Sequence, residues 1–189
     1  LYVENMHRLY GESDLMTVRE HFAQLEGLKM GFVGDGFNMC NSLIVGCLKV
    51  GMKVSVATPE GYEPDAKVLA FAEEMKKQGA SFELSHDIHQ AADNADVLFT
   101  DAWIGMGQEA EAEKRRAAFA GFTVDHDLLS CCKEGVMVQH CLPAHRGEEI
   151  TDEVLEEHAD EIFEESENRL HAQKAVMVML MSEKSDFHI

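Results

Sequence analysis

Short apolar runs alternate along this chain with longer segments of helical periodicity. The expected strands lie at 30–33, 53–57, 81–85, 96–100 and 136–140, and the helices between them at 38–50, 65–78, 88–92, 109–119 and 125–132. Parallel strands need a crossover connection, usually a helix, so this alternation is typical of a parallel sheet covered on both faces. The sequence therefore predicts an α/β fold: a three-layer α/β/α sandwich with a mainly parallel, Rossmann-like sheet of about five strands.

The alternation of strands and helices is weaker at the two ends of the chain, and we place the expected domain boundaries there. We expect an N-terminal extension over residues 1–13, one α/β domain over 14–182 and a polar tail over 183–189. No Pro-, Gly- or Ser-rich linker divides the central part, which has an ordinary size for a single domain.

Local patterns near the two ends predict further secondary structure. Ser13 or Asp14 is expected to cap a helix through LMTVREHFAQL, because a short polar side chain accepts from the first amide groups of a helix. Ile162 and Phe163 are expected to add a short extended segment, and a last helix is expected over 168–182.

Acidic residues dominate the charge: 35 Asp and Glu stand against 16 Lys and Arg, for a formal net charge of −19. Such a surface repels phosphate backbones and anionic lipids, so the sequence predicts no nucleic-acid partner and no membrane partner. The five cysteines form an odd set, which fits free thiols in a reducing cytoplasm. The histidines of HDIH and of HCLPAH lack a second ligand pair at structural spacing, so no metal is expected.

The Gly34-Asp35-Gly36 turn after the first strand invites a comparison with dinucleotide sites. Their fingerprint needs a third glycine three positions later, where this chain has Met39, and an acid at the end of the second strand, which here reads Ala57-Thr58-Pro59. Both requirements fail. The sequence therefore predicts no nicotinamide cofactor, and we expect no other cofactor. The two glycines are expected to allow a tight turn between strand and helix.

Polar residues that follow the expected strands are candidates for ligand binding, because ligands of open α/β sheets bind where the strands end. Asn38 lies in the first turn of a helix, where amide groups and the helix dipole favour an anion such as a carboxylate. Asp101 can hold an ammonium group or cap the turn that follows it. The segment of Gly105, Met106 and Gly107 has the two glycines of a loop that closes over a ligand.

Cys141 follows the last strand and has three possible uses. A covalent nucleophile needs a base and an activated thiolate, and the adjacent His140 is disfavoured as that base because neighbours on a strand point to opposite faces. A polar residue that orients a substrate amine fits better. The third possibility is a small apolar residue that is simply buried.

Several motifs, in order and at sensible spacing, resemble ornithine carbamoyltransferase. They are GDGFN at Asn38, TDAWIGMGQE at Asp101, HCLP at Cys141 and ESENR ending at Arg169, together with TPEGYEP and GEEITDEV. The resemblance runs from about Asp14 to Met181 and covers only the second, amino-acid-binding domain of that family. It implies a transferase, with ornithine or a similar amino acid as partner, and a last helix that crosses back to a first domain.

The resemblance also implies roles for individual residues. Asn38, Asp101 and Met106, with Gly105 beside them, are expected to hold the α-amino and α-carboxylate groups of ornithine. Cys141, Leu142 and Arg169 are expected to line the place where the side-chain amine meets carbamoyl phosphate, with Cys141 and Arg169 as the catalytic residues. An amine attacks a carbonyl only when neutral, and an arginine near the phosphate supplies fixed charge, so the roles are chemically consistent.

Two departures from the family pattern concern the substrate. Gly105 stands where the family usually has the serine of Ser-Met-Gly, and Phe37 stands where it often has a first asparagine. A related amine such as putrescine therefore stays an alternative to ornithine, although Asn38 and Asp101 favour ornithine.

A third departure concerns carbamoyl phosphate. The Ser-x-Arg-Thr string that binds it in the family's first domain does not occur in these 189 residues. We expect this chain to use carbamoyl phosphate only with a first domain supplied elsewhere, and to show no transfer alone. A non-catalytic amino-acid-binding or regulatory module is the alternative. We also expect a homo-oligomer, held through residues 1–25 and the last helix.

Overall fold

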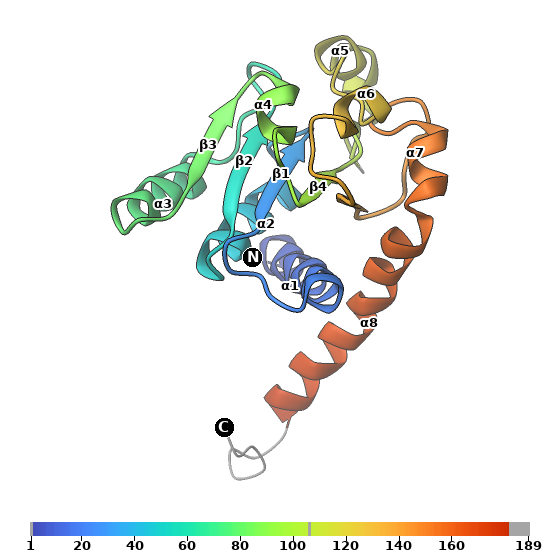
Figure 1. The fold of residues 1–189 in the computed structure, drawn as a ribbon. Coiled ribbons are helices and arrows are strands. Elements are labelled where there is room, and N and C mark those ends of the chain that lie inside the picture. The colour runs from blue at the N-terminus through green and yellow to red at the C-terminus, as the bar shows by residue number, and fades with distance from the viewer. Residues whose placement is uncertain (1, 106, 182–189) are drawn as a thin grey trace.

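The computed structural model describes residues 2–105 and 107–181 (Figure 1). The strands are β1 (Lys29–Val33), β2 (Lys53–Ala57), β3 (Phe82–Ser85), β4 (Val97–Thr100) and β5 (Met137–His140). The helices are α1 (Tyr2–Phe22), α2 (Asn38–Lys49), α3 (Ala66–Lys77), α4 (Ile88–Ala92), α5 (Ala112–Ala118), α6 (His126–Leu129), α7 (Asp152–Glu157) and α8 (Ala159–Met181), with a 3-10 turn η1 (Glu109–Glu111) before α5.

The five strands form one parallel sheet in the order β3-β2-β1-β4-β5. The chain moves outward from β1 to β3, then returns to the other side of β1 for β4 and β5. The order therefore reverses between β1 and β4, which is the topological switch point of a doubly wound sheet. The predicted α/β class and the parallel, Rossmann-like sheet are confirmed.

Apolar side chains cover both faces of the sheet. On one face, Met30 and Phe32 of β1 pack with residues of α1, α2 and α3. On the other face, Val33 of β1 and Leu98 of β4 pack with residues of α4, α6 and α7. Strands buried on both faces read as continuous apolar runs, which is why the sequence reveals them so clearly.

Helix α1 corrects the expected start of the first helix. Ser13 and Asp14 do not cap it, because α1 runs without a break from Tyr2 to Phe22 and both side chains are buried within it. The Thr17 hydroxyl donates to the Ser13 carbonyl one turn earlier (3.0 Å). The expected boundary between residues 13 and 14 lies inside this helix. The expected tail, residues 183–189, lies outside the described residues.

Helix α8 corrects a second expectation. Ile162 and Phe163 were expected to be extended, but α8 begins at Ala159 and includes both residues. A two-residue apolar run cannot form a ladder without a partner strand, and here the buried Ile162 packs in the core beside Val154 and Leu155 of α7. The last helix is therefore longer than the expected 168–182 segment.

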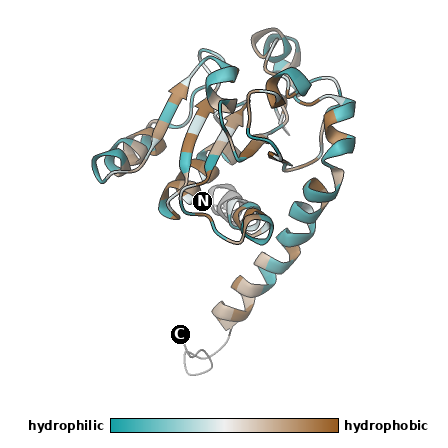
Figure 2. Ribbon diagram, viewed as in Figure 1, coloured by the Kyte–Doolittle hydropathy of each residue, from teal (hydrophilic) through white to brown (hydrophobic). Residues whose placement is uncertain are grey.

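The end of α8 leaves the body of the molecule (Figure 1). Figure 2 shows apolar residues both in the sheet and along this end of the helix. There Met177, Val178, Met179, Leu180 and Met181 are all exposed. Within residues 2–105 and 107–181, no helix has the length and apolar character that a membrane crossing requires.

One glycine limits how the sheet can change. A Cβ added at Gly31 of β1 would lie 2.6 Å from the Ala91 carbonyl oxygen and 3.0 Å from Leu98 Cδ1. We expect Gly31→Ala to destabilise the fold by about 1–3 kcal/mol, because the clash is with backbone. Gly11→Ala, where the nearest atom is Ser42 Cβ at 3.4 Å, is the matched control and is expected to be neutral or stabilising. Urea unfolding of both variants measures the difference; equal midpoints would contradict the packing argument.

Candidate functional site

The site lies at the carboxyl ends of the strands β1, β4 and β5. Asp101 follows β4 directly, Cys141 follows β5, and Asn38 is the first residue of α2 after β1. The Thr100 hydroxyl donates to the Val33 carbonyl (2.8 Å) and so ties the ends of β4 and β1 together. The parallel register thus brings to one place three residues that are far apart in sequence.

Cys141 and Asp101 are in direct contact. The Cys141 thiol donates to Asp101 Oδ1 at 2.9 Å. Burial, and next the Asp101 carboxylate, raise the pKa of the Cys141 thiol well above its usual range. The thiol is therefore protonated at neutral pH. This state suits a hydrogen-bond donor and does not suit a thiolate nucleophile.

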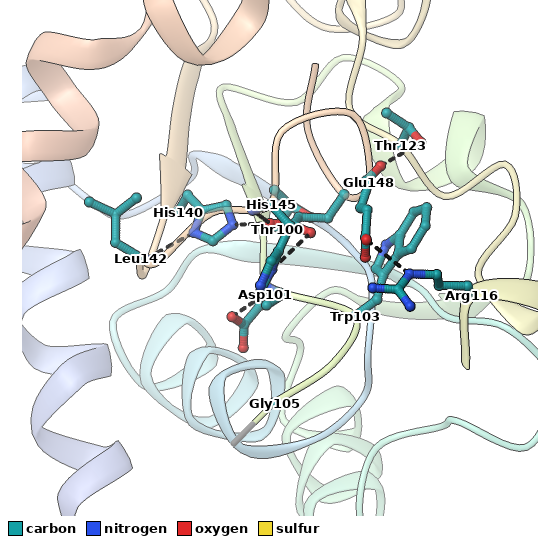
Figure 3. Close-up of polar contacts among 12 residues, drawn as sticks. Thr100, Asp101, Trp103, Gly105, Arg116, Thr123, His140, Leu142, His145 and Glu148 are labelled. Carbon is teal, nitrogen blue, oxygen red and sulfur yellow. Dashed lines mark hydrogen bonds and ion pairs between the residues drawn. The ribbon is translucent and has the colours of Figure 1, made fainter. Parts of the chain in front are cut away.

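His140 is engaged elsewhere, as strand alternation predicts. Its Nδ1 accepts from the Leu142 amide (2.9 Å), which assigns the proton to Nε2, 3.0 Å from Glu149 Oε1 (Figure 3). Glu149 also accepts from the His145 amide (2.6 Å). His140 and Glu149 are both fully buried. Together they hold the HCLP turn, in which Leu142 has a left-handed φ of 43° and precedes a cis proline.

Arg169 reaches the same turn from α8. Its guanidinium donates to the Cys141 carbonyl and lies 3.6 Å from the Glu165 carboxylate one turn earlier. Cys141 therefore contacts both Asp101 and Arg169, and Leu142 follows it in the same turn.

The loop after Asp101 is braced by its own contacts. Asp101 Oδ1 accepts from the Ala102 amide (2.7 Å), so Asp101 also shapes its own turn. The Gly105 amide donates to Gln108 Oε1 (2.9 Å). Met106 lies outside the described residues. Asn38 is half-buried at the start of α2, and the exposed Phe37 before it provides no side-chain cap.

A buried arginine that the sequence analysis did not single out joins two loops of the site. Arg115 of α5 donates to the Trp103 carbonyl (2.5 Å) and to Asp35 of the GDG turn. Burial raises the pKa of Asp35 to about 6, against the opposing effect of Arg115. In the sequence Arg115 is one of two adjacent arginines of the expected 109–119 helix, and nothing local marks it as buried.

The loop after the HCLP turn is also anchored. Glu148 accepts from Arg116 Nε (2.9 Å) through its side chain and from the Thr123 hydroxyl (2.7 Å) through its carbonyl (Figure 3). Throughout residues 2–105 and 107–181, no three His, Cys, Asp or Glu side chains gather in a way that could hold a metal ion.

Residues 26–180 match the family model described as aspartate/ornithine carbamoyltransferase, Asp/Orn binding domain. The chain belongs to the aspartate/ornithine carbamoyltransferase family. It is 50% identical to an ornithine carbamoyltransferase of Pyrococcus horikoshii over 176 residues, which are 93% of this chain and 56% of the relative. It is 51% identical to one of Gloeobacter violaceus over 170 residues, 89% of this chain and 54% of that protein.

Solved carbamoyltransferase structures have the same fold. That of the Pyrococcus furiosus ornithine carbamoyltransferase has a TM-score of 0.82 at 48% identity, with 90% of this chain and 55% of that chain covered. An N-acetyl-L-ornithine transcarbamylase has a TM-score of 0.76 at 28% identity, covering 92% of this chain and 56% of that one. The chain spans about half the length of these family members. It corresponds to their amino-acid-binding domain.

The protonated thiol gives a direct prediction. Asp101→Asn is expected to increase alkylation of Cys141 by iodoacetamide up to about tenfold for each unit by which the pKa falls, because the substitution removes the carboxylate that disfavours the thiolate. Peptide mass spectrometry at pH 8 reads the rate, with Cys131 in the same sample as the internal control. An unchanged Cys141 rate would contradict the assigned contact.

Proposed function

We propose that this chain supplies the amino-acid side of an ornithine carbamoyltransferase site. In this reaction the carbamoyl group moves from carbamoyl phosphate to the side-chain amine of ornithine and gives citrulline. The observation that carries the proposal is the contact between the Cys141 thiol and Asp101 at the ends of β5 and β4. Membership of the family and the place of this contact near the switch point support it.

Asn38, Asp101, Gly105 and Met106 are the proposed residues for the α-substituents of ornithine. Asn38 begins α2, where the free amide groups and the positive end of the helix dipole favour a carboxylate. Asp101 offers a carboxylate to the α-ammonium group. Gly105 and Met106 belong to the loop after Asp101, and the proposal places them against the bound amino acid.

Cys141, Leu142 and Arg169 are proposed to line the reacting end. The neutral amine nitrogen attacks the carbonyl carbon, the carbon–oxygen bond to phosphate breaks, and the amine gives up a proton to the leaving phosphate. The protonated Cys141 thiol orients the amine without competing as a nucleophile. Arg169 places a fixed positive charge beside the developing negative charge.

We propose that carbamoyl phosphate binds to residues outside these 189. The Ser-x-Arg-Thr string of the family's first domain does not occur among them. The exposed apolar end of α8 suits packing against such a domain or another chain. We further propose that the protein acts as a cytoplasmic homo-oligomer in arginine metabolism.

A different amine substrate is the second candidate. Gly105 and Phe37 depart from the family pattern at the amino-acid loop and at the start of α2. One structural relative is an N-acetyl-L-ornithine transcarbamylase, so proteins with this fold are named for more than one substrate. If the tests below show no transfer to ornithine, the substrate is a related amine such as putrescine, or the chain has a non-catalytic amino-acid-binding role.

The chain alone is expected to form no citrulline from L-ornithine and carbamoyl phosphate. Adding the separately produced first domain of the Pyrococcus furiosus relative is expected to restore turnover, and Cys141→Ala in the same mixture to reduce it by about 100-fold or more. A colorimetric citrulline assay reads both. Robust turnover by the chain alone would refute the first expectation. Tight ornithine binding in calorimetry with no need for carbamoyl phosphate would favour the non-catalytic module.

Gly105→Ser tests the amino-acid loop. Among the described residues, a Cβ at Gly105 meets the flexible Gln108 side chain, at 3.2 Å, so the variant should fold normally. The added hydroxyl is expected to tighten ornithine binding up to about tenfold, the equivalent of one hydrogen bond. Titration of the complemented protein with L-ornithine and with putrescine measures the change. An equal gain for both amines would argue against a contact with the α-substituents.

A further inference from the structure

Two carboxyl groups lie together, out of contact with water, between the first and last helices. Asp14 of α1 and Glu165 of α8 are both fully buried, and their side chains lie close enough to interact. The two helices pack against each other along this stretch, where Asn168 Nδ2 of α8 donates to Thr17 Oγ1 (2.9 Å) and Glu20 Oε2 (2.8 Å) of α1.

Two ionised carboxylates cannot hydrogen-bond, because neither has a proton to donate. If both were ionised, Asp14 Oδ2 and Glu165 Oε1 would be buried acceptors without a donor at hydrogen-bonding distance among the described residues. A buried polar atom left in this state costs about 1–3 kcal/mol, and more when it is charged. A single proton shared between the two carboxyl groups would let one of them donate to the other.

The remaining contacts show which residue carries the proton. Glu165 Oε2 accepts from the His140 amide (3.1 Å), and Glu165 Oε1 lies 3.6 Å from the Arg169 guanidinium. Both contacts favour an ionised Glu165, against burial, which raises the pKa of Glu165 above its usual range. Among the described residues, Asp14 Oδ1 has a long contact from the Ser13 hydroxyl (3.5 Å). Burial and the neighbouring Glu165 raise the pKa of Asp14 well above its usual range, which agrees with a proton on Asp14.

We propose that Asp14 and Glu165 share one proton, carried by Asp14, and that this pair positions Arg169 and the Cys141 turn. Glu165 holds the His140 amide on one side of Cys141 and the Arg169 guanidinium on the other. Neither carboxyl group has to touch the substrate. Both are positioning residues that act through Arg169 and the backbone of the HCLP turn.

The proton also sets the charge beside the site. With Asp14 neutral, the negative charge of Glu165 is balanced by Arg169. His140, from β5, directs its Nε2 proton to Glu149. Ionisation of Asp14 would place a second carboxylate near Arg169 and compete with the Cys141 carbonyl for the guanidinium. The shared proton does not depend on the proposed function, whereas its effect on carbamoyl transfer does.

The pair makes stability depend on pH in a defined direction. The folded chain keeps a proton that the unfolded Asp14, with an ordinary pKa near 3.8, has lost. Between that value and the raised pKa, the unfolding constant therefore rises up to tenfold per pH unit as the pH increases. Asp14→Asn keeps a hydrogen-bond donor toward Glu165 and does not titrate, so this component of the slope is expected to disappear.

Urea unfolding between pH 5 and pH 8 tests the pair with four variants. Asp14→Asn is expected to flatten the pH dependence and to be at least as stable as the wild type at pH 8. Asp14→Ala, which cannot donate, should be less stable than Asp14→Asn. Glu165→Gln should raise the unfolding constant about tenfold or more, because it removes the charge that Arg169 faces. Glu161→Gln is the matched control: it removes a carboxylate of α8 that accepts from β5 and from His158, and should leave the Asp14 component of the slope in place.

Infrared spectroscopy supplies a readout that a purely structural role would not change. The wild type at pH 7 should show a carboxylic-acid carbonyl band that is lost in Asp14→Asn and kept in Glu161→Gln. Absence of this band in the wild type, or an unchanged pH slope in Asp14→Asn, would overturn the proposal. In the complemented citrulline assay, Glu165→Gln should lower kcat at least tenfold. If no protein in that assay forms citrulline, the proposed function fails while the infrared result still decides the shared proton.

Discussion

The edge of the sheet is covered by two glutamates of one helix. β5 is an outer strand, and its outward amide groups at Val138 and His140 donate to Glu161 (2.6 Å) and Glu165 (3.1 Å) of α8. Alternate residues of a strand and residues one helical turn apart lie at similar spacing, so helix and strand match. This contact protects an edge that could otherwise pair with another chain. It also fixes α8 beside the Cys141 turn.

The position of α8 decides the chemistry of the site. One turn beyond Glu165, Arg169 reaches the Cys141 carbonyl, and on the other side of the same turn the Cys141 thiol donates to Asp101. Carboxylates therefore surround the turn as acceptors, and together with burial, which has the larger effect, they raise the pKa of the Cys141 thiol. Some of the many acidic residues of the sequence therefore have a structural role at the site. Their buried carboxylates accept from backbone, thiol and guanidinium donors.

Sequence reasoning found the strands and the residues that end them, because burial on both faces leaves continuous apolar runs and the chemistry follows them directly. It did not find the residues that support the site. Glu149 reads as part of a solvated acidic segment, yet it is fully buried against His140. Asp14 reads as a helix cap, yet it lies inside α1 against α8. Such roles depend on contacts that local sequence does not show. Glu149 contacts His140, 9 positions away, and Thr17, on the same helix as Asp14, contacts Asn168, 151 positions away.

The sequence by itself determined the α/β class, the parallel sheet and the family, since these follow from local periodicity and from motifs that are continuous in the chain. Only the tertiary structure decided which residues meet. Asp101 and Cys141 are 40 positions apart and touch because β4 and β5 are neighbours in register. Asp14 and Glu165 meet because α1 packs on α8. Protonation states at the site depend on these long-range contacts and on burial, and neither is written in local sequence.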